Sequence, residues 1–209
     1  MPLTESSKDE LKEQLCAILA GRGDGIDLDT PFHWVIEGLK QPGAFFDQLP
    51  GLLPPDSVLY VEGTRIVGEV ASFYSAHHAR NAVAVVRDTI APAPDVYHFA
   101  FSPDVCAGLR RLSERHPVAE MFDHLKAYRG ENLLFTFHDA FSGWLLVSEH
   151  LSEETVAQFC QSLGVSRRRE ATKRRDPEQL RQFLWALENP RKVRIAGESW
   201  WSRFKRRWL

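Results

Sequence analysis

Short apolar segments, each ended by a turn or a helix cap, constrain the fold of this 209-residue chain most. Residues 57–62 and 96–101 read as strands, and residues 132–138 and 144–149 flank a five-residue loop that ends in Gly143. This spacing predicts a β-hairpin. The segment 57–62 is apolar on both faces, which predicts a strand buried on both sides. No apolar run reaches the roughly 18 residues of a membrane-spanning helix.

Helix caps mark two further elements, and apolar spacing marks a third. Ser102 followed by Pro103 is a cap with a first-turn proline and predicts a helix that runs to about Glu114. Ser152 precedes two glutamates, which favours a helix that ends at Gly164. Residues 66–79 carry apolar positions at helical spacing and predict another helix.

Four further helical segments are predicted. An opening helix starts at a capping box over Ser7–Glu10, and a second helix begins at Thr30-Pro31 with Phe32, Val35, Ile36 and Leu39 inward. Residues 41–49 predict a short helical turn that ends at Pro50. The fourth segment is a helix from His116-Pro117 to Tyr128.

The order of these elements predicts an α+β (mixed α/β) fold, with a mixed sheet of four to five strands and flanking helices. We expect an acidic globular domain over residues 1–165, with a helical part over about 1–55. Residues 166–176 are rich in arginine and poor in apolar residues, and predict a solvated basic linker. Residues 177–209 form the expected helical basic and aromatic tail.

The charge is divided unevenly along the chain, although the net charge is only −2. Residues 167–209 hold 14 Lys/Arg and 5 Asp/Glu, a balance of +9. The preceding 166 residues hold 12 basic and 23 acidic residues, a balance of −11. Such a tail is typical of contact with nucleic acid, with an anionic membrane, or with the acidic body itself.

One histidine and carboxylate pattern has the composition of a metal or acid/base site. His116, Glu120 and His124 are spaced four apart and would share one face of the predicted helix, and His138-Asp139 follows on the hairpin. A cluster of Glu120, His124, His138 and Asp139 could bind zinc, manganese or iron, or move protons. The same residue pattern also fits a capped helix whose polar face contacts a hairpin and that binds no ligand. We therefore expect neither a cofactor nor a bound metal.

Other catalytic and targeting signals are absent from the sequence. The three cysteines are widely spaced and form no C-x-x-C pair, which indicates reduced thiols in the cytoplasm. Cys106 lies near a predicted helix start, where we expect an apolar contact and not a nucleophile. The polar N-terminal segment has no apolar signal region, so we expect no secretory signal.

The C-terminal twelve residues are the most distinctive segment. At 100° per residue, four aromatic side chains fall within one arc of a helix, and the cations occupy the rest of the circumference. The predicted docking residues are Trp200, Trp201, Arg203, Phe204, Lys205, Arg206, Arg207 and Trp208. This basic amphipathic helix suits a protein groove, its own body or an anionic membrane. Nucleic acid is a less favoured partner, because the sequence contains no nucleic-acid recognition motif such as a helix-turn-helix or an RNP box.

These observations favour a non-enzymatic cytoplasmic interaction protein, such as an adaptor, an immunity-type protein or a regulatory subunit. A protein partner or self-association is the expected contact. The first alternative is a metal-dependent or acid/base enzyme that uses the histidine and carboxylate cluster. The second is a peripheral membrane or nucleic-acid binder that acts through the tail.

Overall fold

The computed structural model describes residues 30–79 and 94–172, together with residues 12, 28, 85, 178, 181, 184 and 185. Within these residues seven strands form one sheet in the order β3-β2-β4-β5-β6-β1-β7, and every neighbouring pair is antiparallel. The strands are β1 (Phe32–Glu37), β2 (Val58–Gly63), β3 (Asp95–Ala100), β4 (His124–Arg129), β5 (Asn132–Phe137), β6 (Leu145–Ser148) and β7 (Ser166–Ala171).

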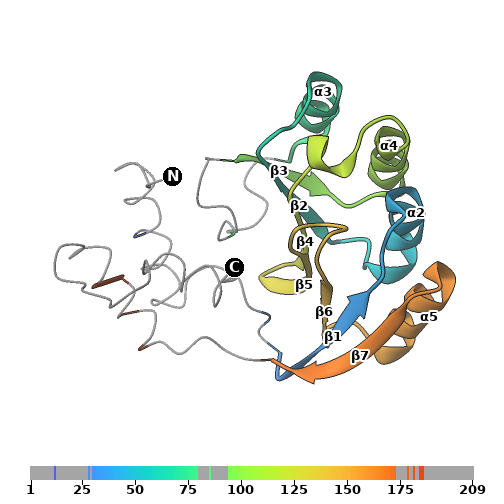
Figure 1. The fold of residues 1–209 in the computed structure, drawn as a ribbon, viewed down its shortest axis with the longest axis vertical. Helices are drawn as coiled ribbons and strands as arrows, with labels where there is room; N and C mark the ends of the chain where they lie inside the picture. Colours follow the sequence, from blue (N-terminus) through green and yellow to red (C-terminus); the bar gives the residue numbers. More distant parts are fainter. Residues whose placement is uncertain are drawn as a thin grey trace, which may run out of the picture.

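Four α-helices of the described residues lie together on one side of this sheet (Figure 1). They are α2 (Pro42–Leu52), α3 (Gly68–His77), α4 (Pro103–Ser113) and α5 (Glu153–Leu163), and a 3-10 turn (Val118–Glu120) precedes β4. The predicted α+β class is confirmed. The prediction of a mixed sheet of four to five strands is wrong, because three strands lie in segments that were assigned to helices or to a linker.

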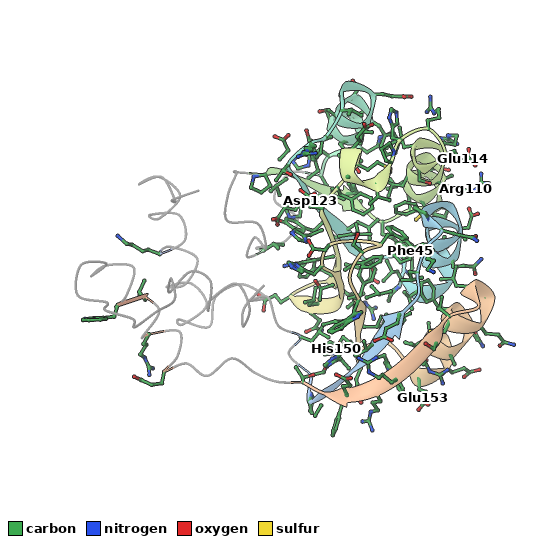
Figure 2. The ribbon with its side chains drawn as sticks, in the orientation of Figure 1. Phe45, Arg110, Glu114, Asp123, His150 and Glu153 are labelled. Atoms are coloured by element: carbon green, nitrogen blue, oxygen red, sulfur yellow. The ribbon has the colours of Figure 1, made fainter. Side chains whose placement is uncertain are left out.

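A cluster of phenylalanine rings forms the centre of the core between the helices and the sheet. Phe45 of α2 is fully buried and lies at this boundary (Figure 2). Its ring centroid is 5.4–6.3 Å from those of Phe46, Phe135, Phe137, Phe141 and Phe159. Tilted and edge-to-face pairs at these distances are favourable beyond the apolar area that they bury. They join α2 to β5, to α5 and to the loop between β5 and β6.

The helices with strong caps form where the sequence predicts them. The Ser102 hydroxyl accepts a hydrogen bond from the Val105 amide at 3.2 Å, and the Ser152 hydroxyl accepts one from Thr155 at 3.1 Å. Gly164 ends α5 in the left-handed conformation, with a φ of 64°. These caps act within a single turn of chain, so tertiary packing does not need to supply the signal.

The Thr30-Pro31 signal predicts a helix over residues 30–39, and this prediction is wrong. The segment contains β1 instead. The Thr30 hydroxyl donates to the Phe32 carbonyl at 2.7 Å and so does not cap helix amides. In β1, Trp34 and Ile36 face the helices while Val35 faces the opposite side. A six-residue segment fits both periods, and pairing with β6 and β7 on its two sides selects the strand.

The predicted helix from His116 to Tyr128 is also wrong. Only the 3-10 turn at Val118–Glu120 is helical, and β4 follows from His124. Leu125 and Ala127 face the helices, while His124, Lys126 and Tyr128 alternate with them. β4 lies between β2 and β5 in the middle of the sheet, so ladder hydrogen bonds on both sides favour the extended chain.

The residues expected to begin a basic linker form the last strand of the sheet. β7 pairs with β1 over its whole length, from Phe32↔Ala171 to Glu37↔Ser166. All six of its residues are exposed, which explains the polar sequence that resembled a linker. The sheet therefore continues beyond the boundary predicted at residue 165.

Two further predictions have mixed outcomes. The short helical turn over 41–49 is longer than expected, since α2 runs through Pro50 to Leu52. A proline so near the end of a helix removes one of its last hydrogen bonds and no more. The opening helix and the docking residues 200–208 lie outside the described residues. In the segment 177–209, Glu178, Arg181, Leu184 and Trp185 are described and are helical.

We predict that a chain truncated after Thr172 unfolds cooperatively, whereas one truncated after Val165 is less stable and aggregates. The shorter chain loses β7 and exposes the unpaired edge of β1, which presents a row of free amides and carbonyls. Thermal unfolding followed by circular dichroism, with light scattering, measures both effects. Equal melting temperatures would show that β7 contributes nothing to the sheet.

Candidate functional site

The sheet face opposite the helices carries polar side chains at the positions that alternate with the core residues. We call this the polar face, and it comprises Tyr60, Glu62, His98, His124, Lys126, Thr136 and His138. The strand register places Tyr60 between His98 and Lys126, and Lys126 beside Thr136. It also pairs Glu62 with His124. Four neighbouring strands, β3, β2, β4 and β5, thus contribute to one polar surface.

Two residues of opposite charge are fully buried on this face. Glu62 and Lys126 are each 0% exposed. The Tyr60 hydroxyl donates to the Glu62 carboxylate at 2.8 Å, and the Lys126 ammonium lies 5.8 Å from the centroid of the Tyr60 ring. Burying a charge is costly unless other charges and hydrogen bonds compensate it. Tyr60 therefore links the carboxylate and the ammonium in one buried network.

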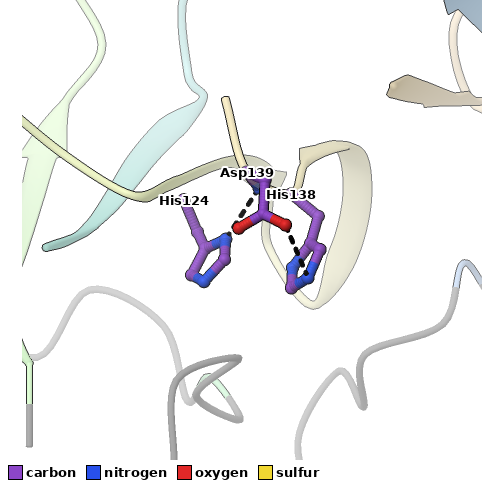
Figure 3. Close-up of side chains that lie close together, drawn as sticks. All are labelled: His124, His138 and Asp139. Atoms are coloured by element: carbon purple, nitrogen blue, oxygen red, sulfur yellow. Dashed lines mark hydrogen bonds and ion pairs between the residues drawn. The ribbon is translucent and has the colours of Figure 1, made fainter. Parts of the chain in front are cut away.

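His124, His138 and Asp139 converge at the edge of the polar face (Figure 3). The two imidazole rings are stacked, with centroids 4.2 Å apart and planes at 8°. The Asp139 amide donates to His124 Nδ1 at 3.0 Å, and the Asp139 carboxylate lies 3.8 Å from His138 Nε2. One potential ligand atom from each residue lies within 4.8 Å of the others.

The loop after β5 has the backbone geometry that this convergence requires. Asp139 and Phe141 both have a positive φ, 45° and 65°, which is costly for residues with a Cβ. The Asp139 carbonyl accepts hydrogen bonds from the amides of Ser142 and Gly143 at 2.8 Å. A Cβ at position 143 would lie 2.4 Å from the His138 carbonyl oxygen, so only glycine fits there.

Asp123 ties this loop to the turn after β2. Its carboxylate accepts hydrogen bonds from the amide and the hydroxyl of Thr64, at 2.8 and 2.7 Å. Its carbonyl accepts one from the Ala140 amide at 2.9 Å. Two turns are thus joined through one residue that immediately precedes β4.

The hydrogen bond to His124 limits the chemistry of this cluster. A neutral imidazole that accepts at Nδ1 carries its proton on Nε2. A metal ion needs a ring nitrogen without a proton, and His ligands usually donate from the other nitrogen to an acceptor. Here the group that faces Nδ1 is itself a donor. Metal binding at His124 would therefore break the bond that anchors Asp139, and the geometry favours a structural role.

The predicted cluster is only partly assembled. His124, His138 and Asp139 come together, but they do so across two strands and not on a helix face. Glu120 is apart from them and lies 3.5 Å from His116 Nδ1. Sequence reasoning missed Tyr60, Glu62 and Lys126. The signal that could have found them is the alternation in β4, where His124, Lys126 and Tyr128 are separated by the apolar residues Leu125 and Ala127. This pattern predicts a strand with one polar face.

Cys106 makes the apolar contact that its sequence position predicts. It is buried in α4, and burial raises the pKa of its thiol to about 12. The thiolate is the nucleophilic form of cysteine, so this side chain is unreactive at neutral pH.

The exposed strand β7 is a second candidate site. Each of its three arginines lies over an aromatic ring: Arg167 is 5.4 Å from the Trp34 ring centroid, Arg168 is 5.9 Å from that of Trp144 and Arg169 is 4.2 Å from that of Phe32. Carboxylates also pair with them, since Arg168 contacts Glu37 and Glu170, Arg169 contacts Glu149 and Arg167 contacts Glu153. Phe32 and Trp144 are 39% and 59% exposed.

A single hydrogen bond shows which way the backbone of β7 points. The Thr172 amide donates to the Pro31 carbonyl at 2.9 Å, toward β1. In a strand, successive residues direct their amides and carbonyls to opposite sides. The backbone groups that point away from β1 are therefore those of Arg167, Arg169 and Ala171. Within the described ranges, β7 ends the sheet order and has β1 as its neighbouring strand.

Comparison with protein-family models, curated proteins and solved structures found no match to this chain. Among the helices of the described ranges, none has the length and the apolar composition needed to cross a bilayer.

We predict that His124→Asn is tolerated better than His124→Gln. The asparagine oxygen occupies the position of Nδ1 and keeps an acceptor for the Asp139 amide, whereas the glutamine oxygen reaches the position of Nε2. Losing this part-buried hydrogen bond costs about 0.5–1.5 kcal/mol. Urea denaturation of the two variants measures the difference. Equal losses of stability would mean that the bond to Nδ1 does not anchor the loop.

We also predict that part of the stability is lost as the pH falls below about 6.5, through His33 of β1. Burial lowers the pKa of His33 from its ordinary value of 6.5, so below that pH the unfolded chain binds more protons than the folded chain. Its Nδ1 lies 2.9 Å from the Thr172 hydroxyl, next to the end of β7.

His33→Asn provides the matched control, because it retains a polar atom near Nδ1 and does not titrate. Urea midpoints of the two proteins at about pH 7.5 and about pH 5.5 isolate the contribution of His33. The wild-type midpoint should fall more than that of the variant. Parallel decreases would assign the acid sensitivity to other groups.

Proposed function

We propose that this protein is a non-enzymatic interaction protein of the cytoplasm, of the adaptor, immunity or regulatory type, and that it binds its partner by adding a strand to β7. The observation that carries the proposal is the exposed terminal strand whose outer backbone groups, at Arg167, Arg169 and Ala171, point away from the sheet. An exposed strand edge is a template for pairing with an extended segment of another chain.

The side chains around β7 support a binding role. Arginine and tryptophan are enriched among the residues that contribute most to protein interfaces. The stacking of Arg168 near Trp144, and of Arg169 on Phe32, holds the long side chains in place before a partner arrives. Less conformational entropy is then lost on binding.

The polar face supports an enzymatic role less well. Its carboxylate and hydroxyl groups bond to one another, and His124 uses Nδ1 to anchor the Asp139 amide. Each of these bonds has a structural purpose in the fold. A general base needs a lone pair that is directed at a substrate.

Arg169→Pro is expected to abolish capture of the partner, whereas Arg169→Thr retains most of it. Both variants lose the arginine side chain, but only proline lacks the amide that points away from β1. Proline is tolerated at this side of an edge strand, so the melting temperatures of the two variants should be similar. Affinity capture from the native host, quantified by mass spectrometry, compares them. Identical sets of captured proteins would contradict strand addition at β7.

A further inference from the structure

We propose that the strand added to β7 is β7 of a second copy of this chain, so that two chains form one continuous antiparallel sheet. The twofold axis passes beside Arg169. This inference rests on the proposed function, since it names the partner of the same strand edge.

The direction of the backbone groups limits how two copies of β7 can pair. In an antiparallel ladder, residues whose amides and carbonyls point outward must lie opposite one another to exchange hydrogen bonds. The outward residues are Arg167, Arg169 and Ala171. The pairings that use the middle of the strand are the one centred on Arg169 and the two displaced so that Arg168 or Glu170 faces its own copy.

The charges of β7 select one of these registers. With Arg169 opposite itself, Arg168 faces Glu170 of the second copy, and this pair occurs twice. With Arg168 opposite itself, Arg167 also faces Arg169, and all these contacts join like charges. With Glu170 opposite itself, two carboxylates meet. Opposite charges on facing strand positions are favourable and like charges are not, so the register centred on Arg169 is preferred.

The structure also reduces the repulsion between the two Arg169 side chains at the centre. Each guanidinium group contacts Glu149, with its Nε at 2.9 Å from the carboxylate, and lies 4.2 Å from the ring centroid of Phe32 in β1. Glu149 follows β6, and Phe32 lies on β1, so both contacts draw the side chain inward over the sheet. The positive charge is thus paired and is directed away from the outer edge.

The sequence of β7 favours a second copy over a uniformly acidic partner. Arg168 and Glu170 lie two residues apart on the same face, so the strand presents both signs of charge. A strand with only acidic side chains would place a carboxylate opposite Glu170. The antiparallel second copy instead supplies an arginine there and a glutamate opposite Arg168.

A disulfide between Arg169→Cys chains tests the pairing in the full-length protein, with Cys16 replaced by serine. The Cα atoms of a directly opposed, hydrogen-bonded pair are about 5.5 Å apart, which suits a disulfide. Arg168→Cys is the matched control, because its two copies are offset by two residues along the strands and lie too far apart. Under mild oxidation, Arg169→Cys should form a cross-linked dimer readily and Arg168→Cys should not.

Two further variants check the register. Combining Arg168→Cys with Glu170→Cys should restore cross-linking, because these positions face each other. Adding Glu170→Lys to Arg169→Cys should reduce the yield of dimer several-fold, since lysine then faces Arg168. Light scattering of the unmodified protein should show a mass that rises with concentration from 23.9 kDa toward twice that value.

Each outcome either supports the inference or overturns it. Equal cross-linking of Arg169→Cys and Arg168→Cys, or none in either, overturns self-pairing in this register. In that case the Arg169→Pro variant is compared with Arg169→Thr in the affinity capture from the host. If Arg169→Pro fails to capture a protein other than this chain that Arg169→Thr does capture, strand addition at β7 stands and only the identity of the partner is wrong. If both tests fail, the proposed function fails as well.

Discussion

The packing of Phe45 against five other phenylalanine rings is the interaction on which the rest of the structure depends. It holds α2 on the sheet through Phe135 and Phe137, and it joins α2 to α5 through Phe159. It also holds Phe141, whose positive φ is unfavourable in isolation. Packing of that partly buried ring against the core compensates for the backbone strain. The same loop then brings the Asp139 amide to His124, so the core determines the geometry of a polar cluster on the other face of the sheet.

The two faces of the sheet have different physical roles. The face under the helices is apolar and supplies most of the drive for folding. The polar face buries Glu62 and Lys126, which costs free energy unless each charge is compensated. Such networks demand one arrangement of their members, because a wrong register would leave a buried charge without its partner. The polar face thus disfavours other strand registers.

The terminal strand β7 connects this fold to the proposed function. Three successive arginines in an exposed strand, even with carboxylates beside them, protect an edge against unspecific pairing, because charged side chains on an edge strand disfavour most added strands. A partner with the complementary arrangement is not excluded in this way. The same side chains therefore disfavour strands without complementary charges and favour a strand that has them. This is consistent with a strand that recognises its own copy.

Several elements could be predicted from the sequence because their signals act over a few residues. The caps at Ser102 and Ser152, the end of α5 at Gly164 and the hairpin of β5 and β6 need only neighbouring amides and a turn. The convergence of His138 and Asp139 with a histidine was expected as well, although from a helix that does not form. The burial of Lys126 was not expected, because its neighbours on β2 and β5 are distant in sequence.

The sequence by itself determined the α+β class, the capped helices and the strands with strong apolar character. Only the tertiary structure decided that β1, β4 and β7 are strands. Each of these segments has six residues, a length at which helical and strand periodicities overlap. The hydrogen bonds that settle the choice come from strands elsewhere in the chain. For β7 the partner strand is about 130 residues or more away, from 129 residues in Glu37↔Ser166 to 139 in Phe32↔Ala171, and a local pattern carries no information about it.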